Sequence, residues 1–185
     1  MSTQPKAYIT EEQYLEIEER SEQPSEYFRG EMFPMEATIA HVMIKDNLLL
    51  VLARELTGSD CRAFSNELRI KVSETGLYTY PDVAIVCGKL QVAENDKNSV
   101  TNPKILIEVL SPTGEGYTKF LYYRSNPTFV EYLLIAQDRV RLEHYIKQSD
   151  GGWLMHETSD PDALISLESI PVRFKLSEAY RGVEF

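Results

Sequence analysis

The spacing of apolar residues predicts two helices in the first third of the chain. The first is expected over residues 11–20, where Thr10 can act as the N-cap and Gln13 can complete a capping box. The second and longer helix is expected over residues 38–57, because its apolar residues recur mainly at helical spacings. Between the two helices, short extended runs on either side of Arg29-Gly30 predict a hairpin.

The rest of the chain carries short apolar runs that predict strands. Residues 82–87 and 104–110 are almost continuously apolar, which is typical of strands buried on both faces. Partial alternation predicts a strand at residues 61–72. A hairpin signal at Gln137-Asp138 predicts strands at 131–136 and 139–147, and another strand is expected at 153–157, after a turn. A loop is expected at 93–102 and a short helix at 117–125, whereas 169–180 fits either a strand or a helix. This order favours an α/β or α+β protein with a central mixed β-sheet flanked by helices, plus a C-terminal β meander.

Length and composition limit the class of protein. The 185 residues are expected to form a single domain, 1–185. Hydrophobic residues make up 43% and charged residues 26%, which excludes a disordered tail, a collagen and a coiled coil. No apolar run is long enough to span a membrane, and residues 1–6 lack the apolar segment of a secretory signal. A cytoplasmic protein without a membrane partner is therefore expected.

Cysteine content and charge add two further expectations. Cys61 and Cys87 match no common metal-ligand spacing, and we expect both to be free thiols in a reducing cytoplasm. The net charge of −10 argues against a nucleic-acid partner at first sight. The acidic excess lies toward the two ends of the chain, however, and residues 37–149 carry as many bases as acids. A local basic face in this middle part can still meet a polyanion.

Two carboxylates lie where a folded chain disfavours them. Asp82 leads directly into an apolar run, and Glu108 lies inside the run 105–110. A buried carboxylate is costly unless it is paired or binds a metal. If the two strands are neighbours, both acids reach one point at the sheet edge, where two oxygen ligands suit Mg²⁺. The alternative is that Glu108 faces solvent or pairs with an arginine.

Several motifs in the same order carry a family resemblance. Residues 80–83 (Tyr-Pro-Asp-Val) and 103–112, which contain Glu108, resemble the Uma-type "putative restriction endonuclease" family of the PD-(D/E)XK nuclease superfamily. Three other segments are similar to that family: the hairpin at 26–31, the helix headed by His41 and the return at 123–135. The resemblance covers about residues 8–150. It implies a restriction-endonuclease-like core there, followed by a C-terminal β extension over 151–185.

The resemblance also implies a catalytic apparatus. Asp82 and Glu108 would bind Mg²⁺, with Mn²⁺ as a substitute, in an endonuclease that hydrolyses DNA phosphodiester bonds. The superfamily's usual lysine lies two residues after the second acid, where this chain has Leu110. The matching residue of the Uma-type family is Lys119, which would orient the attacking water or stabilise charge on the phosphate. A surface lysine is the alternative reading of Lys119.

Two further residues are expected to line the same pocket. Glu26 would be a third acid, although in a hairpin it could equally lie at the surface. His41 would act as a general base near neutral pH, or else orient or cap its neighbours. Nucleases of this kind often act as homodimers because a duplex presents two strands, and the exposed strand edges of the C-terminal meander are the expected interface.

One segment departs from the family pattern. Residues 111–119 form a shorter loop than the family's, and they lack an aspartate before the lysine. A displacement of about 1 Å at a catalytic group can reduce the rate about a hundredfold. The alternative function is therefore a catalytically lapsed nuclease-fold protein that serves as a binding or regulatory module. An esterase is not supported, because the chain has no Gly-x-Ser-x-Gly motif.

Overall fold

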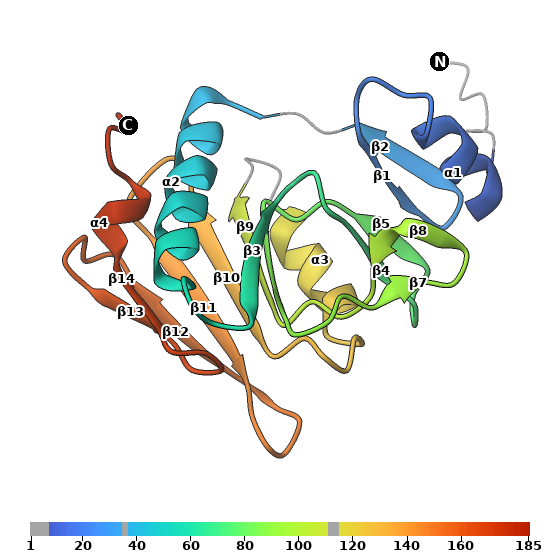
Figure 1. Ribbon diagram of the computed structural model, residues 1–185. Helices are drawn as coiled ribbons and strands as arrows, with labels where there is room; N and C mark the ends of the chain where they lie inside the picture. Colours follow the sequence, from blue (N-terminus) through green and yellow to red (C-terminus); the bar gives the residue numbers. More distant parts are fainter. Residues whose placement is uncertain (1–7, 35–36, 111–114) are drawn as a thin grey trace.

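The computed structural model describes residues 8–34, 37–110 and 115–185 (Figure 1). Two six-stranded sheets make up most of it, with a two-stranded ribbon near the C-terminus. Within these described ranges, no helix is both long and apolar enough to cross a membrane. The mixed α+β architecture expected from the order of elements is confirmed.

The central sheet is mixed, as expected. Its strands, in order across the sheet, are β12 (Trp153–Thr158), β11 (Leu142–Lys147), β10 (Glu131–Ala136), β9 (Ile105–Leu110), β6 (Val83–Cys87) and β3 (Cys61–Ser65). β9 and β10 run parallel, and all other neighbours in this sheet are antiparallel. The strands β9 and β10 are joined through a helix, because a parallel pair needs a crossover connection.

The second sheet contains the largest differences from the sequence-based expectations. Its strands, in order, are β2 (Glu31–Pro34), β1 (Ser25–Phe28), β5 (Leu77–Thr79), β4 (Arg69–Val72), β8 (Asp96–Val100) and β7 (Val92–Ala93). The single strand expected at 61–72 is wrong, since a turn after Ser65 sends β3 and β4 into different sheets. The loop expected at 93–102 contains β8, whose pairing with β4 outweighs its polar sequence.

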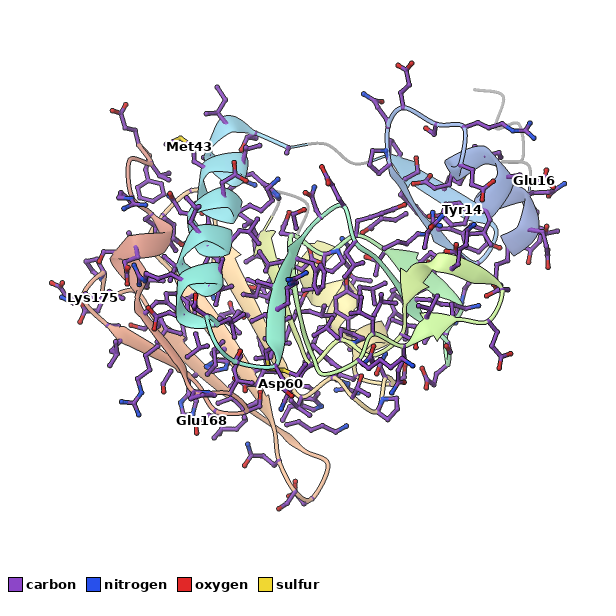
Figure 2. All side chains as sticks on the ribbon, viewed as in Figure 1. Tyr14, Glu16, Met43, Asp60, Glu168 and Lys175 are labelled. Carbon is purple, nitrogen blue, oxygen red and sulfur yellow. A yellow bond between two sulfur atoms is a disulfide. The ribbon has the colours of Figure 1, made fainter. Side chains whose placement is uncertain are left out.

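The helices expected at 11–20, 38–57 and 117–125 are present, and each begins within two residues of its expected start. The helices of the described chain are α1 (Glu11–Glu18), α2 (Ile39–Glu55), α3 (Glu115–Tyr123) and α4 (Leu176–Ala179). The capping box at the start of α1 is confirmed, because Thr10 and Gln13 exchange hydrogen bonds. Figure 2 shows the amphipathic character of α1: Tyr14 points toward the second sheet, and Glu16 points away from it.

The two faces of the central sheet are covered by different elements. Ile105 and Ile107 face α2, while Leu106 faces the side on which α3 and the second sheet pack (Figure 1). This alternation explains the continuous apolar runs, because both faces of β6 and β9 are buried. The segment 169–180, which fitted either a strand or a helix, contains both. The strand β14 (Val172–Lys175) pairs with β13 (Leu164–Leu167) and leads directly into α4.

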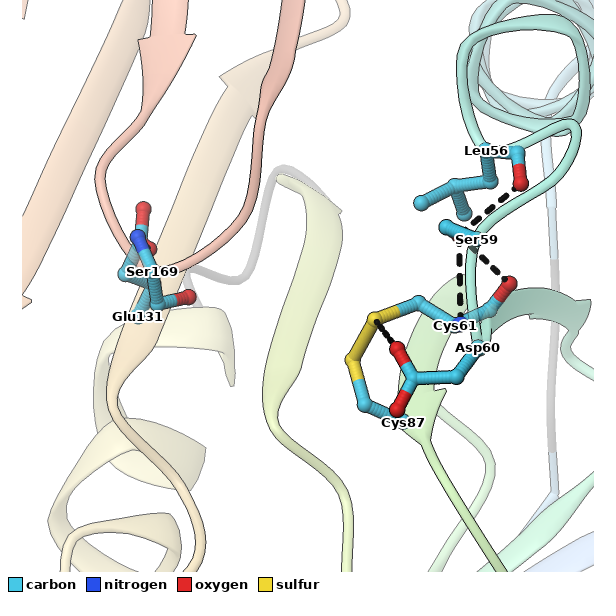
Figure 3. The surroundings of a disulfide bond; sticks show 7 residues. All are labelled: Leu56, Ser59, Asp60, Cys61, Cys87, Glu131 and Ser169. Atoms are coloured by element: carbon cyan, nitrogen blue, oxygen red, sulfur yellow. Dashed lines mark hydrogen bonds between the residues drawn. A yellow bond between two sulfur atoms is a disulfide. The ribbon is translucent and has the colours of Figure 1, made fainter.

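The cysteines are not free thiols, contrary to the expectation from their spacing. Cys61 and Cys87 form a disulfide that joins the start of β3 to the end of β6 (Figure 3). The antiparallel register places these two residues directly opposite each other. Their separation of 26 positions gave no sign of this, because the contact depends on how two distant strands pair. The disulfide is at the far end of this strand pair from Asp82.

Candidate active site

Asp82 and Glu108 meet at one end of the central sheet. Val83 lies opposite Ile107 in the antiparallel pair β6–β9, so Asp82, one residue earlier, comes level with Glu108. The backbone N–H of Val109 donates a 2.8 Å hydrogen bond to Oδ2 of Asp82. Both acids are buried. The condition stated from the sequence, that the two strands are neighbours, is therefore met.

Lys119 connects these acids to the second sheet. Its Nζ atom, on α3, lies 2.7 Å from Oε1 of Glu26 and 3.5 Å from Oε1 of Glu108. Glu26, on β1, also accepts a 2.6 Å hydrogen bond from the hydroxyl of Thr79. The shortened loop singled out in the sequence includes residues 111–114, which lie outside the described residues. Lys119 itself lies beside the carboxylates of Glu26 and Glu108.

Glu108 is surrounded by more negative than positive charge. The pKa of Glu108 is raised to about 8: burial is the largest cause, and the carboxylates of Asp82 and Glu26 act in the same direction, against the opposing effect of Lys119. The hydroxyl of Tyr123 donates a 2.8 Å hydrogen bond to Oε1 of Glu108. The pKa of Lys119 is raised, because Glu108 and Glu26 outweigh the effect of its burial. A further cation would relieve the repulsion among the carboxylates.

His41 fixes the second oxygen of Asp82. The ring lies in the first turn of α2, which begins after the N-cap Thr38, and its Nε2 atom is 2.7 Å from Oδ1 of Asp82. With Val109 on Oδ2, both oxygens of this carboxylate have partners. His41 therefore contacts the acid pair through Asp82, which fits an orienting role for the histidine.

All five residues predicted from the sequence line a single pocket of about 300 Å³. They come from five different parts of the fold: Glu26 from β1, His41 from α2, Asp82 from the residue before β6, Glu108 from β9 and Lys119 from α3. The remaining wall includes both polar and apolar side chains. These are Pro24, Phe33, Pro34, Ala37, Val42, Lys45, Asn66, Tyr80, Val109 and Gly116.

Sequence reasoning missed three residues of the site: Lys45 lines the pocket, and Tyr123 and Thr79 donate hydrogen bonds to its carboxylates. Tyr123 was noted only as the first residue of the family-like segment 123–135, without a role in the site, and Thr79 carried no recognisable motif. Their hydroxyl oxygens lie 3.0 Å apart and connect Glu108 to Glu26. Lys45 follows His41 by one helical turn, and this spacing on one helix face was the signal available for it.

The donor set of the pocket fits a hard divalent cation. Asp82, Glu108 and Glu26 offer carboxylate oxygens, the ligands that Mg²⁺ prefers. From the described residues, Oε2 of Glu108 and Oε2 of Glu26 receive no hydrogen bond. These oxygens are thus available to a ligand. Burial raises the pKa of Glu108 most, and the neighbouring carboxylates of Asp82 and Glu26 add to it; this excess of negative charge points to the same conclusion.

A second group of ligand-type atoms occurs elsewhere in the described chain. Asp60, Cys61 and Cys87 have one such atom each within 4.8 Å of the others. The two sulfur atoms are bonded to each other, however, and the thiolate is the form that binds metals. In the oxidised protein this group is therefore not a metal site, although it borders a larger cavity of about 600 Å³.

The arrangement of sheets, buried acids and lysine defines a protein of the nuclease fold. A solved structure from Anabaena variabilis, described as "a putative nuclease belonging to DUF820", matches with a TM-score of 0.75 and 22% identity. The match covers 95% of this chain and 99% of that chain. At this level of identity the likeness shows the fold.

The family follows from the sequence itself. The model of the Uma2 family, described as "Putative restriction endonuclease", matches residues 11–179, and the chain belongs to this family. "Uncharacterized protein slr1290" of Synechocystis sp. is 34% identical over 184 residues, covering 96% of this chain and 94% of the relative. "Uncharacterized protein sll1609" of the same organism is 33% identical over 168 residues, covering 89% and 95%.

Proposed function

We propose that this protein is a Mg²⁺-dependent endonuclease that hydrolyses DNA phosphodiester bonds, with Mn²⁺ as a substitute metal. One observation carries the proposal: three carboxylates and Lys119 line a single pocket in a member of a restriction endonuclease family. Such a combination suits phosphoryl chemistry, in which negative charge must be stabilised on a phosphate that is already anionic. No nucleophile motif favours another class of hydrolase.

Asp82 and Glu108 are the proposed metal ligands. The bound ion would lower the pKa of a water molecule and stabilise charge on a phosphoryl oxygen. The protein's own groups prepare the site: Val109 and His41 hold the Asp82 carboxylate, and Tyr123 holds Oε1 of Glu108. Pre-oriented ligands reduce the conformational change that binding requires.

Lys119 is the proposed electrophilic residue. Its ammonium would donate a hydrogen bond to the attacking water or to a non-bridging phosphate oxygen. Glu26 holds that ammonium through a 2.7 Å ion pair, so Glu26 would act as a positioning residue. This arrangement would allow a lysine from α3 to take the role for which Leu110 has no suitable side chain.

A homodimer acting in the cytoplasm is part of the proposal. β12 is the last strand at one side of the central sheet, and its Leu154 and Met155 are each 46% exposed. An exposed edge strand offers unpaired backbone groups to a second copy. Analytical ultracentrifugation of the wild type and of Met155→Lys tests this: the wild type should sediment as a dimer and the variant as a monomer. A monomeric wild type would refute the dimer.

Plasmid nicking tests the activity. Supercoiled DNA is incubated with Mg²⁺, Mn²⁺ or EDTA, and the wild type should nick only when a metal is present. Asp82→Ala should be inactive, whereas Asp162→Asn, at an exposed acid outside the pocket, should behave as the wild type. Activity that survives in Asp82→Ala would contradict the metal-site assignment. A wild type with no activity and no metal binding by calorimetry would favour the lapsed alternative.

A further inference from the structure

Lys45 is a partly buried lysine in the active-site pocket, and no carboxylate of the described residues lies at hydrogen-bonding distance from it. Its side chain is 16% exposed, and its Nζ atom donates to Oδ1 of Asn66 at 3.1 Å. Among the described residues the nearest carboxylate is that of Asp46, which lies 3.6 Å away and is 60% exposed. Because Asp46 is solvent-exposed and lies beyond hydrogen-bonding distance, this pair contributes little, about 0–1 kcal/mol. The ammonium charge of Lys45 is therefore largely unmatched.

Two other lysines of similar exposure show the difference. The side chain of Lys71 is 15% exposed and pairs with Glu11 at 2.8 Å, and that of Lys119 is 17% exposed and pairs with Glu26 at 2.7 Å. A partly buried ammonium is normally held by a carboxylate, because desolvation makes its charge costly. Lys45 has a neutral amide in that position instead, which leaves its positive charge available to an anionic ligand.

Asn66 adds hydrogen-bond donors at the same place. Its Oδ1 atom accepts from Lys45, so the side-chain NH₂ group is turned away from that contact. Among the described residues, this NH₂ group has no acceptor. Asn66 and Lys45 line the same pocket as the candidate catalytic residues. An ammonium beside an unused amide NH₂ is a donor set that suits phosphate oxygens.

The position of Lys45 relates it to the proposed chemistry. It lies four residues after His41 on α2, so both side chains belong to the same helix face. His41 contacts Asp82, whereas Lys45 contacts Asn66 in the turn after β3. The wall of the same pocket includes Val42 and Ala37, which offer surface to a sugar or base.

We propose that Lys45 and Asn66 form a phosphate-binding subsite for a DNA phosphate next to the one that is cleaved; this inference rests on the proposed function. The subsite explains how a chain with a net charge of −10 can hold a polyanion: the favourable charge is local and lies within the pocket. Lys45 contributes to substrate binding in both the ground state and the transition state. Its loss should therefore raise KM and leave kcat unchanged.

The first experiment measures binding of a fluorescein-labelled DNA duplex by anisotropy, with Ca²⁺ in place of Mg²⁺, over a series of KCl concentrations. Each phosphate contact contributes about 0.9 to the slope of log K against log salt concentration. Lys45→Ala should weaken binding severalfold and reduce this slope by about 1. Asn66→Asp, which supplies Lys45 with a carboxylate, should weaken binding in the same direction. Lys97→Ala, at an exposed lysine outside the pocket, is the matched control.

The second experiment locates the contacted phosphate. After the cut position is mapped, duplexes are made with one neutral methylphosphonate linkage beside it. The neutral linkage should raise KM for the wild type and have no further effect on Lys45→Ala, because both changes remove the same contact. Additive effects at every neighbouring linkage would overturn the subsite. Circular dichroism verifies that each variant is folded, and Lys45→Arg should retain most of the binding.

The outcomes separate this inference from the proposed function. If the wild type binds and cuts DNA but Lys45→Ala behaves as Lys97→Ala does, only the subsite is refuted. If the wild type neither binds nor cuts DNA with any metal, the proposed function fails and the subsite fails with it. A reduced slope for Lys45→Ala with an unchanged slope for Lys97→Ala is the result that the subsite predicts.

Discussion

His41 and Asp82 are 41 positions apart in the sequence, yet Nε2 of the histidine lies 2.7 Å from Oδ1 of the aspartate. The contact joins the start of α2 to Asp82, the residue that precedes β6 at the end of the central sheet where the acids lie. With the Val109 N–H on the other oxygen, the Asp82 carboxylate is held in one orientation before any ligand binds. This contact fits a role for His41 in orienting the Asp82 carboxylate, and the sequence alone did not distinguish that role from general-base catalysis.

Replacing His41 should weaken metal binding more than it slows the chemistry. In His41→Ala the Asp82 carboxylate loses one of its two partners, and loss of a group that orients a metal ligand typically costs about 10–100-fold in metal affinity. The Mg²⁺ concentration for half-maximal nicking should rise accordingly, and saturating Mg²⁺ should restore the rate. His156→Ala, at an exposed residue of β12, is the control. A defect that saturating Mg²⁺ fails to restore would instead indicate that His41 is the general base.

Replacing Lys119 should affect the rate directly. Lys119→Ala removes the ammonium between Glu26 and Glu108, and the cleavage rate should fall by about a hundredfold or more. The metal-free variant should also unfold at a lower temperature at neutral pH, because two carboxylates then lose their shared cation. Single-turnover cleavage and thermal denaturation measure the two effects. A cleavage rate equal to that of the wild type would exclude Lys119 from the chemistry.

Acid should destabilise the protein partly through Asp96. Burial acts to raise the pKa of Asp96, but hydrogen bonds from Ser99, the Asn98 N–H and Arg69 lower it below its usual 3.8. The folded state therefore favours the ionised form, and this stability is complete above about pH 4 and is lost as the pH falls below it. Thermal denaturation between pH 2 and 6 should show a steeper loss for the wild type than for Asp96→Asn.

The Asp96→Asn variant also has an expected effect at neutral pH. Arg69 is buried and donates to Asp96 through two of its nitrogen atoms. Removing the carboxylate leaves a buried guanidinium without its counter-charge, which should cost about 3 kcal/mol of unfolding free energy. If the variant were as stable as the wild type at pH 7 and lost stability equally in acid, the ion pair would be of no consequence.

Reducing the disulfide should lower stability without removing the active site. Closing a loop of this length contributes about 3 kcal/mol in the chain-entropy model, and dithiothreitol should remove that contribution. Cys61 and Cys87 lie at the opposite end of the β3–β6 pair from Ser65 and Val83, so metal-dependent cleavage should persist at low temperature. Denaturation with and without dithiothreitol measures the change. Two reactive thiols in the folded, unreduced protein would contradict the bond.

The strongest local signals gave the correct elements. Capping by Thr10, the turn at Arg29-Gly30 and the apolar runs around Ile85 and Ile107 each depend on neighbouring residues, and each element formed where it was predicted. In that turn Arg29 and Gly30 both have positive φ, as a tight hairpin requires. Interactions between residues close in the sequence were therefore sufficient to predict these parts of the fold.

Contacts between distant segments were beyond the reach of such patterns. β8 is polar and forms a strand because β4 lies beside it, and the two cysteines meet because β3 and β6 pair. The contact of Lys119 with Glu26 spans 93 positions. The family resemblance drew attention to both residues. Their distance from each other and the hydrogen bond of Tyr123 to Glu108 became known only from the folded structure. The environment of Lys45 also became known only from the structure, in which a neutral amide, and no carboxylate of the described residues, lies at hydrogen-bonding distance.

The most direct test is anomalous diffraction from crystals of the protein soaked in Mn²⁺. We predict a peak in contact with carboxylate oxygens of both Asp82 and Glu108 in the wild type, and its loss in Asp82→Asn crystals of the same form. A well-ordered pocket without a peak, with Mn²⁺ bound only elsewhere, would contradict the claim that these two acids form a divalent-metal site.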